Sequence, residues 1–386
     1  MREVTDQALP RRQLADLALV FLKLGTIAFG GPAAHIALMQ REFVDRHGWL
    51  SKEEFLDLVG AASLIPGPSS TEVAIYTGYR RAGFAGLIVA GCCFILPAAV
   101  MVAALAWAYV HVGTLPQASA VLYGVKAVVI PIVAQALVSL GRAAVKTRAL
   151  LALGLMAVLA NALGVNPLVV LAGAGLLNAL RASARRSAPA SSAVLLVGTG
   201  GVAATSAAVV PVSLTKLFLV FAKIGAVVFG SGYVLLAFLR ADFVGGTHLL
   251  SEAQLLDAVA VGQVTPGPVF TTATFIGYVV AGPLGAAVAT VGIFLPSFVL
   301  VAASGPLIPR LRRSPVAASV LDGVNVAAVA VILVVGVQLA ETALVDVTAI
   351  LLAALGFVAL VRLRLNSAWL VAAGALAGLM RAWLGS

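Results

Sequence analysis

The stretch FLKLGTIAFGG at Phe21–Gly31 returns as FAKIGAVVFGS at Phe221–Ser231, 200 residues later. Pro66-Gly67-Pro68 recurs at the same offset as Pro266-Gly267-Pro268, and beyond these prolines one residue is lost, so that the offset becomes 199. Self-similarity at a fixed spacing is the signature of an internal repeat. We therefore predict that the chain consists of two duplicated halves.

The composition is that of a membrane protein. Of the 386 residues 61% are apolar and 10% are charged, with a net charge of +10 and a mean hydropathy of +1.08. Soluble domains are typically about 45–50% apolar and about 25% charged. Because backbone groups in lipid must be satisfied within the segment, the spans are predicted to be α-helices. We expect an all-α polytopic protein in a lipid bilayer and no binding of nucleic acid.

Basic residues alternate between corresponding loops of the two halves. The loop with Arg80-Arg81 corresponds to Val280–Pro283, which has no basic residue. Likewise, Gly141–Arg148 has three basic residues, and the corresponding loop Ala340–Asp346 has none. Near Gly305–Pro315 it is instead the second half that carries the basic residues. Because cytoplasmic loops carry the excess of Lys and Arg, the repeats are predicted to have inverted topology. We place the amino terminus in the cytoplasm and the carboxyl terminus in the periplasm.

We divide the chain into four parts: a cytoplasmic segment 1–13, a first repeat 14–180, a basic linker with a central crossing helix 181–212, and a second, inverted repeat 213–386. Each repeat is predicted to have about six segments. Two of them are interrupted, in the first repeat Leu14–Glu42 and Phe55–Tyr79, and are either re-entrant hairpins or full crossings. The other four are predicted crossings, at Phe84–Val110, Gln117–Gly141, Leu150–Leu163 and Pro167–Leu180.

Interrupted helices at matching positions of inverted repeats are typical of secondary transporters. A half-helix that begins near the bilayer midplane directs N–H groups and a positive dipole end inward, which suits an anion. The alternative is that Gly and Pro merely permit kinks and close packing. The candidate substrate-binding residues at the breaks are Gly30, Gly31, Pro66, Gly67, Pro68, Ser69, Ser70, Thr71, Gly230, Ser231, Gly232, Pro266, Gly267, Pro268, Thr271 and Thr272.

Charged residues inside apolar segments add further candidates. Lys23 and Lys223 stand seven residues before Gly30 and Gly230, which is about 10 Å of helix. Either they offer positive charge to the anion or they extend to the headgroups. Glu72 follows the hydroxyl cluster and is a candidate proton-coupling group, with a structural ion pair as the alternative. Additional candidates are Lys126, its counterpart Asn325, and His35, for which a simple hydrogen-bonding role is the alternative.

Enzymatic chemistry has no support in the sequence. The four histidines show no metal-ligand spacing, and no nucleophile elbow, phosphate loop or ATP-binding cassette is present. We expect no cofactor, no metal and no catalytic residue.

Four stretches resemble the chromate transporter family in its long, two-domain form: FGGPAAHI at Phe29–Ile36, IPGPSSTEVAIYTGY at Ile65–Tyr79, FGSGYVLLAFLR at Phe229–Arg240 and VGQVTPGPVFTTATFIGY at Val261–Tyr278. The resemblance implies efflux of chromate across the bacterial inner membrane, chromate resistance, and energy from an ion gradient, with the proton as a candidate. A transporter of sulfate or another tetrahedral oxyanion, or an anion channel, are the alternatives. A homodimer is one assembly that the sequence allows.

Overall fold

The computed structural model describes residues 11–29, 31–113, 115–184, 213–229, 232–304, 314–363 and 365–384. Within these ranges the chain is helical and has no strand. The predicted central crossing lies in 185–212, outside the described residues. The first half contains α1 (Arg11–Ile27), α2 (Gly31–Gln40), η1 (Arg41–Arg46), α3 (Lys52–Ala62), α4 (Ser69–Val112), α5 (Pro116–Ala144), α6 (Arg148–Ala162) and α7 (Pro167–Ala184).

The second half repeats this order. It contains α8 (Leu214–Val227), α9 (Val234–Leu239), η2 (Arg240–Gly246), α10 (Glu252–Val264), η3 (Val269–Thr271), α11 (Thr272–Ser304), α13 (Pro315–Ala343), α14 (Val347–Arg362) and α15 (Ser367–Leu384). In the described part of the chain, six helical stretches are long and apolar enough to cross a membrane, and they include α4, α5 and α7 with their counterparts α11, α13 and α15. The chain is therefore a multi-pass membrane protein.

The helices α6 and α14 are short for helices that cross a membrane. They have 15 and 16 residues, which is about 22–24 Å of helix against a hydrocarbon core of about 30 Å. Both still present large apolar side chains outward, since Leu159 is 64% and Val358 is 53% exposed. Such surfaces are unfavourable in water and suit contact with lipid tails.

The first interrupted element of each repeat folds back on itself. The rings of Phe21 on α1 and Phe43 on η1 lie 5.2 Å apart, and those of Phe221 and Phe243 lie 5.1 Å apart. Each pair joins residues on the two sides of the break at Gly30 or Gly230. Of the two alternatives for these elements, the structure therefore has the hairpin, with the break at its tip.

The second interrupted element is also a hairpin. Helix α3 begins at a capping box of Ser51 and Glu54, and its second-half counterpart α10 begins at one of Ser251 and Gln254. Glu54 lies 3.5 Å from Arg80 across the hairpin. The chain reverses at Pro66-Gly67-Pro68, because proline ends the helical ladder and Gly67 adopts a φ of +137°.

A sharp bend divides α4 into two antiparallel pieces. Ala82 and Gly83 leave helical geometry, and Gly83 has a φ of +58°. The pieces touch without side chains between them, since a Cβ on Gly78 would stand 2.3 Å from the carbonyl oxygen of Gly86. Helix α11 bends in the same way at Ala281 and Gly282. Residues 69–81 of α4 are thus the second arm of the hairpin, and residues 84–112 are a separate crossing.

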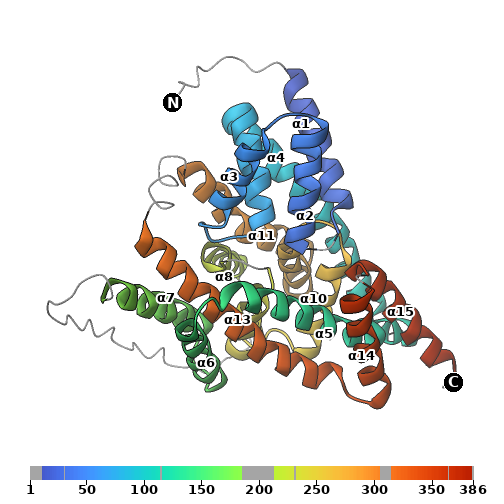
Figure 1. The fold of residues 1–386 in the computed structure, drawn as a ribbon. Helices are drawn as coiled ribbons and strands as arrows, with labels where there is room; N and C mark the ends of the chain where they lie inside the picture. The colour runs from blue at the N-terminus through green and yellow to red at the C-terminus, as the bar shows by residue number, and fades with distance from the viewer. Residues whose placement is uncertain are drawn as a thin grey trace.

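Counterpart helices run antiparallel. Tyr123, near the start of α5, donates a hydrogen bond to Asp346 just beyond the end of α13, whereas Lys146 just beyond the end of α5 contacts Asp322 near the start of α13 at 2.7 Å. The opposite directions of α5 and α13 confirm the inverted repeats. The last two helices of each half pack on the other half: α6 and α7 pack on α13, while α14 and α15 pack on α5 (Figure 1).

Candidate functional site

The tips of the two Pro-Gly-Pro hairpins lie against the other half of the chain. The N–H of Gly67 donates to the carbonyl oxygen of Val228 at 2.7 Å, and the N–H of Gly267 donates to that of Ala28 at 2.8 Å. Val228 and Ala28 directly follow α8 and α1. Each tip therefore closes on the break of the opposite repeat, and all four breaks meet in one region.

A small cavity lies where the breaks meet. It has a volume of about 10 Å³ and is lined by Pro32, His35, Pro68, Ser70, Gly232, Val269 and Phe270. A cavity of this size holds about one water molecule. Its wall is polar where the first repeat contributes His35 and Ser70, and apolar where the second contributes Val269 and Phe270.

His35 is the polar centre of this wall. Its ring is 1% exposed, and its Nδ1 lies 3.2 Å from the hydroxyl of Ser70. Its Nε2 has no hydrogen-bond partner among the described residues. Gly31 and Ser69 begin α2 and α4 beside it, so two helix amino termini with their positive dipole ends flank the cavity.

Glu72 lies behind the first tip, without a partner. It is fully buried, and neither carboxylate oxygen has a hydrogen bond within the described ranges. A Cβ on Gly67 would stand 2.4 Å from Oε1 of Glu72 and 2.5 Å from the hydroxyl of Ser297. Only glycine permits this approach. Ser297 was not among the sequence candidates, although it is a single hydroxyl directly after the repeated Leu295-Pro296.

The other predicted hydroxyls behave differently in the two repeats. Thr71 is buried, and its Oγ1 has no partner in the described part of the chain. Thr271 and Thr272 donate to the carbonyl oxygens of Pro268 and Val269, each at 2.8 Å, and so serve the start of their own helix. The candidates Gly30, Gly230 and Ser231 lie outside the described residues. Pro66 and Pro266 begin the two tips.

The structure does not bring Lys23 and Lys223 to the cavity. Lys23 contacts Glu42 at 2.6 Å, and Lys223 contacts Asp242 at 2.7 Å. Burial acts to raise the pKa of Glu42, but the hydrogen bond from Lys23 and the charges of Lys23 and Arg46 outweigh it, so that pKa lies below its usual value. Each lysine joins the two arms of its hairpin through an ion pair, some distance from the tip.

Lys126 pairs across the repeats. Its ammonium lies 2.9 Å from Asp257 on α10, and Tyr109 donates a hydrogen bond to the same carboxylate at 3.0 Å. The side chain of Asp257 is 4% exposed. The sequence analysis did not predict this pair, because Lys126 and Asp257 lie in different repeats and far apart along the chain.

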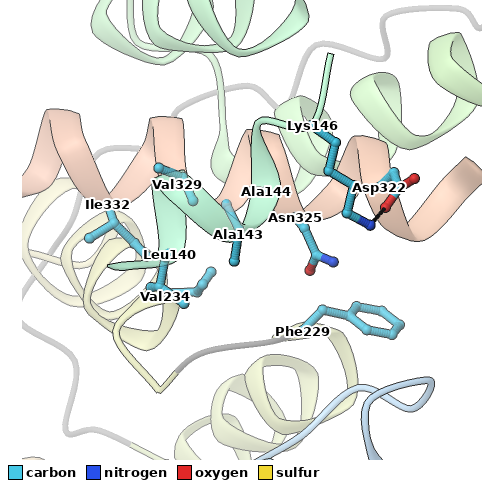
Figure 2. Close-up of a pocket in the computed structure, with 11 residues that line it drawn as sticks. Leu140, Ala143, Ala144, Lys146, Phe229, Val234, Asp322, Asn325, Val329 and Ile332 are labelled. Atoms are coloured by element: carbon cyan, nitrogen blue, oxygen red, sulfur yellow. Dashed lines mark hydrogen bonds and ion pairs between the residues drawn. The ribbon is translucent and has the colours of Figure 1, made fainter. Parts of the chain in front are cut away.

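Asn325, the counterpart of Lys126, lines a larger pocket of about 200 Å³ between α5, α13 and the segment that follows α8. Figure 2 shows its amide facing Phe229 across the pocket, with the Lys146–Asp322 ion pair beside it. Phe229 adjoins the break at Gly230. The pocket thus leads from a basic loop to the region where the breaks meet.

The sequence profile described as "Chromate transporter" matches the chain twice, over residues 15–179 and 215–379. The chain belongs to the chromate transporter family. This transporter is 36% identical over 326 residues to the chromate transport protein of Cupriavidus metallidurans, covering 83% of the chain and 80% of the relative. It is 34% identical to the chromate transport protein of Pseudomonas aeruginosa, covering 76% and 73%.

A more distant relative of the transporter is an uncharacterised transporter of Methanocaldococcus jannaschii, 29% identical and covering 81% of each chain. No solved structure matches. The two matched ranges include every break that closes on the cavity. The central geometry therefore belongs to the part of the transporter that it shares with its family.

Proposed function

We propose that this transporter exports chromate from the bacterial cytoplasm across the inner membrane by alternating access, and so gives resistance to chromate. One observation carries the proposal: in a chain of this family, the breaks of two inverted repeats close reciprocally on one cavity, through Gly67 to Val228 and Gly267 to Ala28. The alternation of basic loops supports an amino terminus in the cytoplasm and a carboxyl terminus in the periplasm.

The size of the cavity supports alternating access rather than an open channel. A space of about 10 Å³ accepts about one water molecule and excludes a tetrahedral oxyanion. Chromate therefore enters only after the tips separate. Because each tip bonds to the opposite repeat, separation requires the repeats to move against each other. The pocket at Asn325 and Lys146 is the route that leads from the cytoplasmic loops.

The proposed site binds the dianion without a lysine. The amino termini of α2 and α4, the hydroxyl of Ser70 and the ring of His35 supply the donors. A helix terminus contributes at most about 2 kcal/mol, so several donors must converge to offset the desolvation of chromate. The same donors suit sulfate, which is the second substrate to test.

The sign of ion coupling follows from Glu72. A carboxylate beside the site repels a dianion, so chromate binds better when Glu72 carries a proton. Proton and chromate then move in the same direction. Two charges leaving a negative interior gain about 4.6 kcal/mol per 100 mV, and one accompanying proton reduces this to about 2.3 kcal/mol. Export therefore proceeds on the membrane potential.

Everted vesicles with an interior-positive potential test the proposal. We expect saturable uptake of labelled chromate accompanied by acidification of the lumen, and loss of uptake in the double variant Gly67→Val/Gly267→Val. Gly83→Ala, which lies outside the proposed site, has a positive φ and would place a Cβ with nothing within 4 Å, is the control for backbone strain. Alkalinisation of the lumen would refute the proposed sign of coupling. Non-saturable flux would favour a channel, and stronger uptake of sulfate would favour the other oxyanion.

A further inference from the structure

A line of buried hydroxyls leads away from Glu72 between α4 and α11. The hydroxyl of Ser297 and the carboxylate of Glu72 both approach Gly67, and neither has a hydrogen-bond partner in the described ranges. One helical turn after Glu72, the hydroxyl of Tyr76 donates to Ser304. Ser304 in turn donates to the carbonyl oxygen of Val301 at 2.8 Å. Their burial is nearly complete, at 0% exposure for Ser297, 4% for Tyr76 and 6% for Ser304.

The line has a direction. Residues 69–81 of α4 run from the tip at Gly67 to Arg80-Arg81, the end predicted to be cytoplasmic. Ser304 is the last residue of α11, seven residues beyond Ser297, which is about 10 Å along the helix. The hydroxyls therefore lead from the central site towards the cytoplasmic face.

The inverted repeat has no such line. In the register of 199, Ser297 and Ser304 correspond to Ala98 and Leu105, and Tyr76 corresponds to Phe275. The structure shows the same correspondence: a Cβ on Gly267 would contact the side chain of Ala98, just as a Cβ on Gly67 would contact that of Ser297. Duplication alone would leave both halves alike here. Hydroxyls buried in a membrane protein are costly unless they are used, so their presence on one side only points to a function.

No charged group competes for Glu72. Helix α11 has no charged residue, and η3 has none. On α1, Lys23 is paired with Glu42, and on α10 Asp257 is paired with Lys126. His35 on α2 faces Ser70, and the charged residues of α3 (Lys52, Glu53, Glu54 and Asp57) are exposed. Within the described chain, Ser297 is thus the polar group that approaches Gly67 together with this carboxyl, and Tyr76 follows one helical turn later.

We infer that Ser297, Tyr76 and Ser304 form a proton path that loads Glu72 from the cytoplasmic side. Tyr76 and Ser304 are joined directly, and water bridges the intervals from Tyr76 to Ser297 and from Ser297 to the carboxylate. Each hydroxyl or water accepts one proton and passes one on, so that one proton moves from solution to the carboxylate and no group in the path is left charged. The path rests on the proposed coupling role of Glu72. It loads the proton from the face at which chromate enters, as transport in one direction requires, and the second repeat offers no equivalent route.

Purified transporter in proteoliposomes tests the path with two readouts: chromate-driven proton movement, followed by a trapped pH dye, and exchange of labelled for unlabelled chromate at equal pH. In Ser297→Ala/Tyr76→Phe we expect proton movement to fall by about tenfold or more, with exchange within about twofold of wild type. The single variant Ser297→Thr keeps the hydroxyl, and its proton movement should be close to that of wild type. Thr290→Val removes a hydroxyl of α11 that bonds Thr274 instead, and should behave as wild type.

The outcomes separate the path from the coupling role. Wild-type proton movement in Ser297→Ala/Tyr76→Phe, together with its loss in Glu72→Gln, overturns the path and leaves the coupling role standing. Proton movement that persists in Glu72→Gln overturns the coupling role itself. An equal loss of exchange and proton movement in the double variant also overturns the path, because the hydroxyls would then serve folding or the substrate.

Discussion

The pair of Lys126 and Asp257 offers a test that separates folding from substrate binding. Asp257 is 4% exposed on its side chain and receives Lys126 at 2.9 Å and Tyr109 at 3.0 Å. In Lys126→Met the carboxylate keeps only the tyrosine. Removing one partner of a buried pair costs about 3–5 kcal/mol, which is a factor of about 10²–10⁴ in the ratio of folded to unfolded protein.

The two single variants differ in severity. Lys126 is 20% exposed, and its flexible stem lets the ammonium reach a more polar position once its partner is gone. Asp257→Asn should therefore cost less than Lys126→Met. In the double variant Lys126→Met/Asp257→Leu no charge remains, and replacing a buried pair by apolar residues is commonly neutral or stabilising. At the positions related by the repeat stand Asp57 in the first half and Asn325 in the second, so the other copy of the pair has no lysine.

The assay combines the apparent unfolding temperature in detergent with chromate uptake into vesicles per folded transporter. We expect the order wild type, double variant, Asp257→Asn, Lys126→Met in stability, and uptake in the double variant close to wild type. A stable double variant without uptake would refute the structural reading and make Lys126 a substrate ligand. An unchanged unfolding temperature in Lys126→Met would show that Asp257 needs no neutralisation.

Three further predictions concern the tip, the α13–α14 connection and the topology. Gly83→Ala should cost about 1–3 kcal/mol of stability through its positive φ alone and leave uptake intact, whereas Gly67→Ala should also abolish uptake, because its Cβ would stand 2.4 Å from Glu72. The pKa of Asp346 is lowered by the hydrogen bond from Tyr123, the bond from the Ala349 N–H and the charge of Arg381. The stability that Asp346 contributes is therefore fully present above the unfolded pKa of about 3.9, and it is lost as the pH falls through the lower folded value. Asp346→Asn should accordingly lower the unfolding temperature at pH 7, and the difference should vanish in strong acid. Cysteines at Arg148 and Val345, in a background without Cys92 and Cys93, should be labelled from opposite faces, and labelling from one face would contradict the inverted repeats.

The sequence predicted the fold class and the breaks because both are local signals. Apolar runs define helices, and Pro-Gly-Pro ends a helix wherever it occurs. It left open whether Leu14–Glu42 crosses the membrane, since that depends on contacts between its arms, such as Phe21 with Phe43. The predicted crossing at Leu150–Leu163 is helix α6, Arg148–Ala162, which begins two residues earlier because the side chain of Thr147 caps it.

The site was harder to predict where partners are distant in sequence. Lys23 was a substrate candidate, yet the acidic residue 19 positions later recurs with it, as Glu42 and as Asp242. That repeated spacing was a signal for an ion pair. Ser297 had no such signal, because a search for matches between repeats passes over a residue whose counterpart is Ala98.

The differences between the repeats carry as much information as the matches. The features that occur in both halves stabilise the scaffold. They are the capping boxes at Ser51 and Ser251, the ion pairs of Lys23 and Lys223, and the tips whose glycines bond the opposite repeat. In the proposed alternating access, the two inverted repeats open the site to the two membrane faces by equivalent movements. Selection for these movements therefore preserves the shared features in both repeats. A proton-binding group beside a site that both halves share is needed only once. Glu72, His35 and Ser297 occur once: His35 lines the cavity, while Glu72 and Ser297 lie behind the tip at Gly67, as a duplicated scaffold with a single proton-binding group requires.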